Sequence, residues 1–296
     1  MRLKSLLLAA VLAIAPLAAY AQTPATPEAE PPMFRAVKIV LIGDSTTAVI
    51  GGWGPSFCGW HVTSFAACIN LARGGRSSGN YRTEGSWRLA MKEIGAGGFQ
   101  DTYVLIQFGH NDQPGKPGRS TDLATEYPAN LKRYVEEVRA AGGKPVLVTP
   151  LTRRQFQDGK LIDDLAPWAE ATRKVAAETK TPLVDLHGKS YAAVQAMGAV
   201  EATRFAQMPP PPEVLAAART GTTISAQPAA PAAPGAAPGA SPALAQQNNA
   251  AVEPMGQAKL SFDYTHLGRD GADYFSKIVT DELAVAVPAL RRYLVP

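Results

Sequence analysis

Three side chains from opposite ends of the chain have the types that nucleophilic catalysis by serine requires: Ser45, Asp263 and His266. A serine hydroxyl is a weak nucleophile near neutral pH until a base removes its proton, and an imidazole works best when a carboxylate fixes its tautomer. Ser45 would be the nucleophile, His266 the general base and then the general acid, and Asp263 the group that orients the imidazole. More than two hundred residues separate Ser45 from the other two, so only the fold can bring them together.

Three turns carry hydrogen-bond donors that could stabilise a negative charge in a transition state. The main-chain amides of Ser45 and Gly75 and the side-chain amide of Asn111 would together form an oxyanion hole. Each motif also has a structural explanation when it is taken alone. Ser45 could cap a helix, Gly75 and Asn111 could be ordinary turn residues, and Asp263 with His266 could be a capping pair. The presence of all of them in one chain favours catalysis.

Short apolar runs alternate with helical patterns along the chain, and this alternation predicts how the candidate residues are held. Runs that are apolar throughout indicate strands that are buried on both faces. Strands that alternate with helices favour an α/β fold with a parallel sheet covered on both faces. Ligand sites usually lie at the carboxyl ends of such strands, where the three turns are expected. The predicted strands are 37–42, 67–71, 103–108, 145–148 and 183–186, and the predicted helices are 127–141, 165–179 and 268–284.

These motifs resemble the four signature blocks of the SGNH (GDSL-like) hydrolases, both in their order and in their placement on loops. Longer matches are similar to the rhamnogalacturonan acetylesterase branch of that superfamily. One departure is the pair Gly79-Asn80, where the branch often carries a second Arg-Ser. The matching blocks are Gly43–Ala48, Gly52–Gly54, Asn70–Ser78, Gln107–Asp112 and Asp263–Leu267, and the resemblance covers about residues 37–200 and 259–290.

The resemblance implies a three-layer α/β/α sandwich of the flavodoxin-like type around a five-stranded parallel sheet. It also implies an exported serine esterase, a carboxylic ester hydrolase that uses no metal and no cofactor. Its expected substrate is an acetylated polysaccharide or oligosaccharide of plant cell walls, such as rhamnogalacturonan, pectin or xylan. The O-acetyl groups would be removed through an acetyl-enzyme intermediate.

Two other interpretations stay open. Another SGNH activity, such as that of a lipid esterase or a thioesterase, would use the same fold and catalytic residues with a different pocket. A non-catalytic module that binds an anion or a carbohydrate could use Ser45–Thr47 as a flavodoxin-like loop does. Such a module would have no need of Asp263 and His266, so the late motif favours an enzyme.

Three further side chains could contact a substrate. Trp53 could stack on a sugar ring or belong to the core. Arg76 could bind a uronic acid carboxylate through two hydrogen bonds, or form a structural salt bridge. His110 could assist the substrate or be a structural histidine. We expect no metal site, because Asp185 and His187 have no third ligand at a suitable spacing.

The first 21 residues predict export. Arg2 and Lys4 give a positive start, residues 6–19 are apolar, and a small-x-small site precedes a cut between Ala21 and Gln22. This pattern is typical of a secretory signal peptide, and it predicts a periplasmic or secreted protein without a membrane anchor. A cytosolic protein with an apolar N-terminal helix is the alternative. The remaining expected segments are a disordered leader at 22–34 and a single hydrolase domain at 35–296, interrupted by a disordered Pro/Ala-rich insertion at about 209–258.

Charge and cysteine content restrict the partners and the compartment. The formal net charge of +4 falls to +2 when Arg2 and Lys4 are removed with the signal peptide. Lysines and arginines form no run, so we expect no nucleic acid partner, and we expect a monomer. Export would allow Cys58 and Cys68 to form a disulfide, and two buried thiols are the alternative.

Overall fold

The computed structural model describes residues 36–226 and 260–296, which all lie in the unit Arg35–Pro296. The predicted signal peptide, the predicted leader and residues 227–258 of the predicted insertion are outside the described residues. Within the described part, no helix has both the length and the apolar character needed to cross a membrane.

Five parallel strands form the central sheet in the order β2-β1-β3-β4-β7. Their register pairs Ile39 with Cys68 and Leu41 with Leu105. The chain moves from β1 to β2 on one side and then continues on the other side with β3, so the direction of winding reverses at β1. Loops that leave the carboxyl ends of β1 and β3 therefore diverge, and this is the place where sheets of this kind usually have a ligand-binding crevice. The strands are β1 (Val37–Gly43), β2 (Ala66–Asn70), β3 (Thr102–Gln107), β4 (Lys144–Val148) and β7 (Leu183–Val184).

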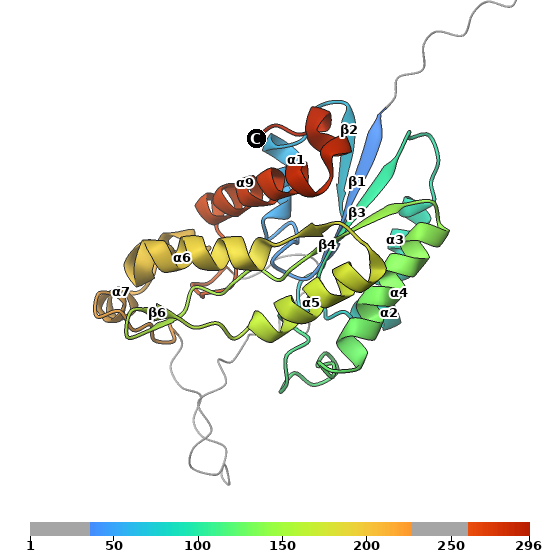
Figure 1. The fold of residues 1–296 in the computed structure, drawn as a ribbon. Coiled ribbons are helices and arrows are strands. Elements are labelled where there is room, and N and C mark those ends of the chain that lie inside the picture. Colours follow the sequence, from blue (N-terminus) through green and yellow to red (C-terminus); the bar gives the residue numbers. More distant parts are fainter. Residues whose placement is uncertain (1–35, 227–259) are drawn as a thin grey trace, which may run out of the picture. The chain divides into compact units, whose positions relative to one another are not determined.

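Helices cover both faces of the sheet, as Figure 1 shows, and this confirms the predicted three-layer α/β/α sandwich. Successive side chains of β1 point to opposite faces. Ile39 and Leu41 share a hydrophobic core with α1, α6 and α9, whereas Val40 and Ile42 share a second core with α3, α4 and α5. The helices are α1 (Gly54–Trp60), α2 (Asn80–Thr83), α3 (Ser86–Ile94), α4 (Glu126–Ala140), α5 (Ala166–Thr179), α6 (Leu186–Ala202) and α9 (Arg269–Ala286).

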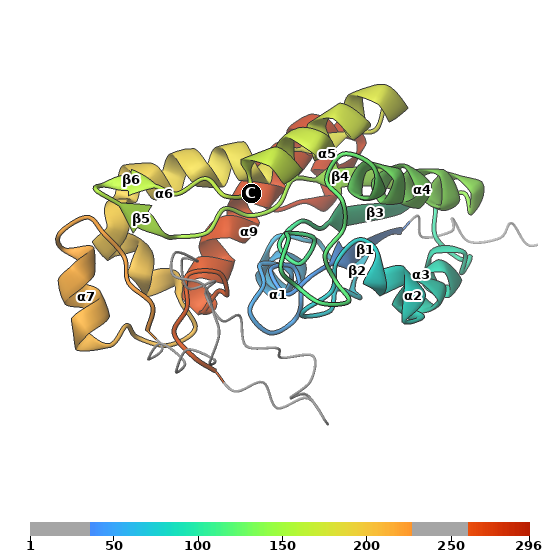
Figure 2. The ribbon, with the colours of Figure 1, turned by 90° about the horizontal axis from the view of Figure 1, so that it is seen from below.

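The segment after α6 corrects one boundary of the predicted insertion. Pro212–Ala218 forms helix α7, whose buried Val214 packs in a small core with Phe262 and Tyr264. Proline is well accommodated in the first turn of a helix, so the proline-rich sequence does not prevent folding. Helix α7 thus lies inside the stretch that was expected to be disordered from about residue 209. Figure 2 shows α7 near the hairpin of β5 (Phe156–Gln157) and β6 (Lys160–Leu161); short 3₁₀ helices span Thr203–Phe205 and Pro288–Tyr293.

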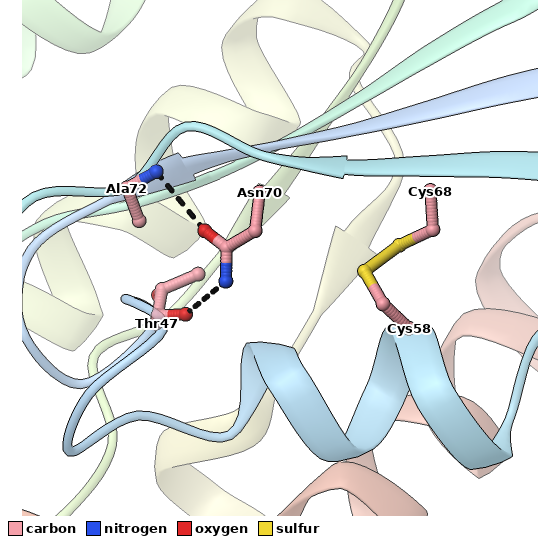
Figure 3. The surroundings of a disulfide bond; sticks show 5 residues. All are labelled: Thr47, Cys58, Cys68, Asn70 and Ala72. Carbon is pink, nitrogen blue, oxygen red and sulfur yellow. Dashed lines mark hydrogen bonds between the residues drawn. A yellow bond between two sulfur atoms is a disulfide. The ribbon is translucent and has the colours of Figure 1, made fainter.

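A disulfide joins α1 to the edge strand β2 (Figure 3). Cys58 and Cys68 are bonded with their Cα atoms 5.4 Å apart. At the end of the same strand, Asn70 Nδ2 donates to the carbonyl oxygen of Thr47 at 2.8 Å, and Asn70 Oδ1 accepts from the amide of Ala72 at 3.0 Å. The loop after β1, helix α1 and strand β2 are thus tied together on one side of the crevice.

Replacing both cysteines by serine, Cys58→Ser with Cys68→Ser, is expected to lower the free energy of unfolding by about 2–3 kcal/mol, because the crosslink closes a short loop in the unfolded chain. Urea unfolding of the oxidised protein and of the double variant measures the difference. The wild-type protein unfolded with a reducing agent serves as the control and should match the variant. Equal midpoints for oxidised wild type and double variant would contradict this estimate.

Candidate active site

The turn after β1 is shaped by a close approach of two strands. A Cβ atom on Gly43 would lie 2.7 Å from the carbonyl oxygen of Gln107, so only glycine fits at the end of β1. Asp44 is fully buried, and its Oδ1 accepts hydrogen bonds from the amide of Thr46 at 2.9 Å and from the Thr46 hydroxyl at 2.8 Å. These contacts fix the turn and leave Ser45 at its top, where 9% of the residue is exposed.

The structure brings Ser45, His266 and Asp263 together in a chain of hydrogen bonds. His266 Nε2 lies 2.9 Å from Ser45 Oγ, across 221 positions of sequence. His266 Nδ1 lies 2.8 Å from Asp263 Oδ2. Because the carboxylate accepts, Nδ1 carries the proton, and the lone pair of Nε2 is directed at the serine hydroxyl. This is the tautomer that removal of the Ser45 proton requires.

Asp263 is held in its ionised form. Burial raises the pKa of this carboxyl, but the hydrogen bond and the charge of His266, together with the amides of His266 and Thr265, outweigh burial and lower the pKa to about 2. Both amides donate to Asp263 Oδ1 at 2.7 Å. The carboxylate therefore orients the ring through one oxygen and closes its own turn through the other.

Two of the three predicted oxyanion donors, Gly75 and Asn111, lie on loops that are bonded to one another. Gly74 lies beside Ser45, since a Cβ atom on this glycine would be 3.7 Å from Ser45 Cβ. Gly75 follows with a φ of +74°, a conformation that suits glycine. The side chain of Asn111 is buried, and its Nδ2 donates to the carbonyl oxygen of Arg76 at 3.0 Å. The loop that carries Gly75 is thus held against the loop that carries Asn111.

Of the three predicted substrate contacts, Arg76 takes the structural alternative. Its Nε lies 2.9 Å and 3.0 Å from the two carboxylate oxygens of Glu84, and its Nη1 donates to the carbonyl oxygen of Gly74 at 2.7 Å. The guanidinium that was considered for a uronic acid therefore already has a carboxylate partner. Through its bond to Gly74, this guanidinium helps to hold the loop of Gly74 and Gly75 in place.

Trp53 and His110 also take their structural alternatives, because neither side chain reaches the surface. Trp53 is 0% exposed, and its Nε1 donates to Gln107 Oε1 at 2.8 Å. His110 is 2% exposed, with its Nδ1 3.4 Å from Asp44 Oδ2. Burial lowers the pKa of His110 more than the charge of Asp44 raises it, which favours the neutral imidazole. This pair lies directly beneath the Ser45 turn.

A buried carboxylate that the sequence did not single out joins the same two loops. Asp112 accepts hydrogen bonds from the amide of Ser78 at 3.0 Å, from the Ser78 hydroxyl at 2.6 Å and from the Thr121 hydroxyl at 2.9 Å. Burial raises the pKa of Asp112 to about 6 despite these bonds. Its position in a block of four consecutive polar or glycine residues after a strand, Gly109–Asp112, is a signal that could have identified it.

Gly51→Ala is expected to lower kcat for ester hydrolysis by about tenfold or more, because small displacements of a catalytic group have large effects. Gly51 has a φ of +88°, and a Cβ atom there would lie 3.2 Å from His266 Cδ2. The substitution would therefore strain the loop and press on the imidazole. Gly97→Ala is the matched control, since a Cβ atom there meets nothing within 4 Å. Equal kcat values for the two variants would contradict the role of Gly51.

Asp263→Asn is expected to destabilise the protein in a pH-dependent way. The carboxyl has a pKa of about 2 in the folded state and an ordinary value of 3.8, so its contribution to stability is present above pH 3.8 and is lost as the pH falls toward 2. Urea midpoints of wild type and variant should differ most near neutral pH and converge below that window. A difference that stays constant down to the acid end would argue against an ionised Asp263.

Comparison with known proteins agrees with this geometry. Residues 41–205 match the GDSL-like Lipase/Acylhydrolase family. A Bacillus subtilis (strain 168) protein named "Probable rhamnogalacturonan acetylesterase YesY" is 36% identical over 161 residues, 52% of this chain and 72% of the relative. A second protein of that strain, rhamnogalacturonan acetylesterase RhgT, is 32% identical over 181 residues, 58% of this chain and 75% of the relative.

The crystal structure of protein YXIM from Bacillus subtilis has the same fold, with a TM-score of 0.54 and 21% identity. The match covers 84% of this chain and 56% of that one. The family match includes the turn of Ser45 and the loops of Gly75 and Asn111. The chain therefore belongs to the GDSL-like lipase/acylhydrolase family, and it is a carboxylic ester hydrolase.

Proposed function

We propose that this protein is an exported carbohydrate esterase that removes O-acetyl groups from rhamnogalacturonan or a related plant polysaccharide. The observation that carries the proposal is the run of contacts from Asp263 through His266 to Ser45, at 2.8 Å and 2.9 Å. The two relatives named as rhamnogalacturonan acetylesterases support the choice of an acetylated pectic substrate.

In the first half of the proposed reaction, Ser45 Oγ attacks the carbonyl carbon of the acetyl group while His266 Nε2 takes the serine proton. The carbonyl oxygen becomes an oxyanion, which accepts hydrogen bonds from the amides of Ser45 and Gly75 and from the side chain of Asn111. The bond to the sugar oxygen then breaks. That oxygen leaves as a hydroxyl with the proton from His266, and the acetyl group stays on Ser45.

In the second half, a water molecule hydrolyses the acetyl-enzyme through the same steps in reverse order. His266 takes a proton from the water molecule, whose oxygen attacks the acetyl carbon and forms a second tetrahedral oxyanion at the same donors. Collapse of this intermediate releases acetate and returns the proton to Ser45. Asp263 stays ionised throughout and stabilises the imidazolium that forms in each half.

Export is part of the proposal for three reasons. The N-terminal sequence has the composition of a signal peptide. The bond between Cys58 and Cys68 is of a kind that persists in oxidising compartments and is rare in the cytosol. A polymeric substrate is also met outside the cell.

Ser45→Ala is expected to reduce the release of acetate by about a thousandfold or more, because removal of the nucleophile of such a site leaves only residual catalysis. The assay measures acetate from acetylated rhamnogalacturonan, pectin and xylan, and rhamnogalacturonan should be hydrolysed fastest. Ser64→Ala, at an exposed serine of the α1–β2 loop, is the control and should keep full activity. Retention of most activity by Ser45→Ala would reject the assignment.

The same enzyme tests both alternatives. Val49 and Ile50, which are 63% and 46% exposed, precede the Gly51 that packs against His266, and these apolar side chains are the feature that favours longer acyl groups. Faster cleavage of long-chain esters than of acetyl esters would make the protein a lipid esterase or a thioesterase. A fluorophosphonate probe that fails to label Ser45 would make it a binding module.

A further inference from the structure

A buried arginine outside the four motifs holds the turn that carries Asp263 and His266. Arg154 follows β4 at the carboxyl edge of the sheet, and 1% of it is exposed. Its Nη2 donates to the carbonyl oxygens of Asp263 at 3.1 Å and His266 at 2.8 Å, and its Nη1 donates to that of Thr265 at 3.3 Å. Its main-chain amide donates to the carbonyl oxygen of Tyr264 at 2.9 Å. One residue thus binds four successive carbonyl groups.

Two of these carbonyl groups belong to peptide groups whose N–H donates a hydrogen bond to Asp263 Oδ1. The peptide between Tyr264 and Thr265 accepts from the Arg154 amide and donates to the carboxylate at 2.7 Å. The peptide between Thr265 and His266 accepts from the guanidinium and donates to the same oxygen at 2.7 Å. Hydrogen bonds in such chains polarise one another, so Arg154 strengthens the bonds that fix the carboxylate.

The guanidinium depends on these carbonyl groups as much as they depend on it. Burial lowers the pKa of Arg154 to about 10, and the nearby charge of Asp263 opposes this effect. A buried cation must be compensated by hydrogen bonds or a counter-charge. The planar guanidinium can serve three carbonyls of one turn at once, which the single ammonium of lysine does with poorer geometry.

Other contacts reach the side chains of the turn or the chain after His266. Tyr264 Oη donates to the carbonyl oxygen of Ile224 at 2.8 Å, and Arg153 Nε donates to Thr265 Oγ1 at 3.3 Å. The amide of Leu267 donates to the carbonyl oxygen of Gly51 at 2.9 Å, and the amide of Gly268 donates to that of Phe205 at 2.8 Å. Helix α9 begins directly afterwards, at Arg269. Arg154 binds the main chain of the turn itself, so this residue controls the position of the backbone from which the His266 side chain extends.

We propose that Arg154 is a positioning residue for ester hydrolysis, which holds the main chain of Asp263–His266 so that the imidazole stays within hydrogen-bond reach of Ser45. The proposal rests on the proposed function, because it assigns Arg154 the task of placing the general base. Arg154 has no contact with the substrate in this role, and its effect is transmitted through the turn.

The test compares Arg154→Lys and Arg154→Met with the control Arg139→Lys. Arg139 also binds a main-chain carbonyl, that of Thr179 at 2.9 Å. This contact lies at the C-terminal end of α4, near the amino ends of the strands and away from the catalytic residues. Hydrolysis of 4-nitrophenyl acetate gives kcat and KM. Proton NMR follows the low-field signal of the His266 Nδ1 proton that is donated to Asp263, and urea unfolding reports the folded fraction.

Both Arg154 variants are expected to lose about tenfold to a hundredfold in kcat, as displaced catalytic groups do, with KM within about twofold of wild type. Their low-field signal should be lost or shifted, with the methionine variant affected more. Arg139→Lys should keep wild-type kcat and signal. If Arg154 serves stability alone, the folded variants will keep wild-type kcat and the wild-type signal, and that result would overturn the proposal.

If neither variant folds, hydrogen exchange of the wild-type protein gives the answer. The amides of Thr265 and His266 should exchange as slowly as those of strand β1, and exchange as fast as in exposed loops would overturn the proposal. Failure of the proposed function looks different. In that case the wild-type protein itself would not release acetate, or Ser45→Ala would remain active, whatever the Arg154 variants do.

Discussion

The hydrogen bond of 2.9 Å between His266 and Ser45 depends on the packing of the last helix against the first strand. Phe275 of α9 lies in the same core as Leu41 of β1, and Ser56 at the start of α1 donates its hydroxyl proton to Asp273 at 2.6 Å. Because protein interiors are closely packed, this arrangement has little freedom. This packing therefore fixes how α9 and β1 lie relative to one another, and the turns next to them then place the imidazole and the hydroxyl.

Beneath the crevice, buried polar side chains replace the apolar contacts that fill the rest of the core. Gln107 Oε1 accepts hydrogen bonds from Thr47 and Trp53, and Asp44 lies against His110. Buried polar groups destabilise a fold unless they are paired. The hydrogen bonds at Gln107 Oε1 and those that Asp44 Oδ1 accepts from Thr46 meet this condition, and they fix the turn that presents the nucleophile.

The strands and the approach of the Ser45, Gly75 and Asn111 turns could be predicted, because buried parallel strands are apolar throughout and polar turns at their carboxyl ends meet at one edge. The convergence of Ser45 with His266 could be predicted only from the types of the catalytic side chains and from the resemblance of their motifs to those of the SGNH hydrolases. The burial of Trp53 could not, since it depends on a hydrogen bond to Gln107, 54 positions away. Arg154 was missed for the same reason: its partners lie 109 to 112 positions away and are main-chain carbonyls, which carry no sequence signal. The Pro/Ala-rich composition likewise gave no indication of α7, because this helix is stabilised by packing.

Loops at the edge of a sheet lack the ladder of hydrogen bonds that strands provide, so their buried carbonyl groups must find other donors. Two arginines supply such donors here. Arg76 binds the carbonyl of Gly74 and Arg154 binds those of the Asp263–His266 turn. An arginine serves this purpose well because it remains charged and offers several donors in one plane. Side chains outside the catalytic triad therefore fix the main-chain geometry at the site. The side chains of Ser45 and His266 are left free to take part in the reaction.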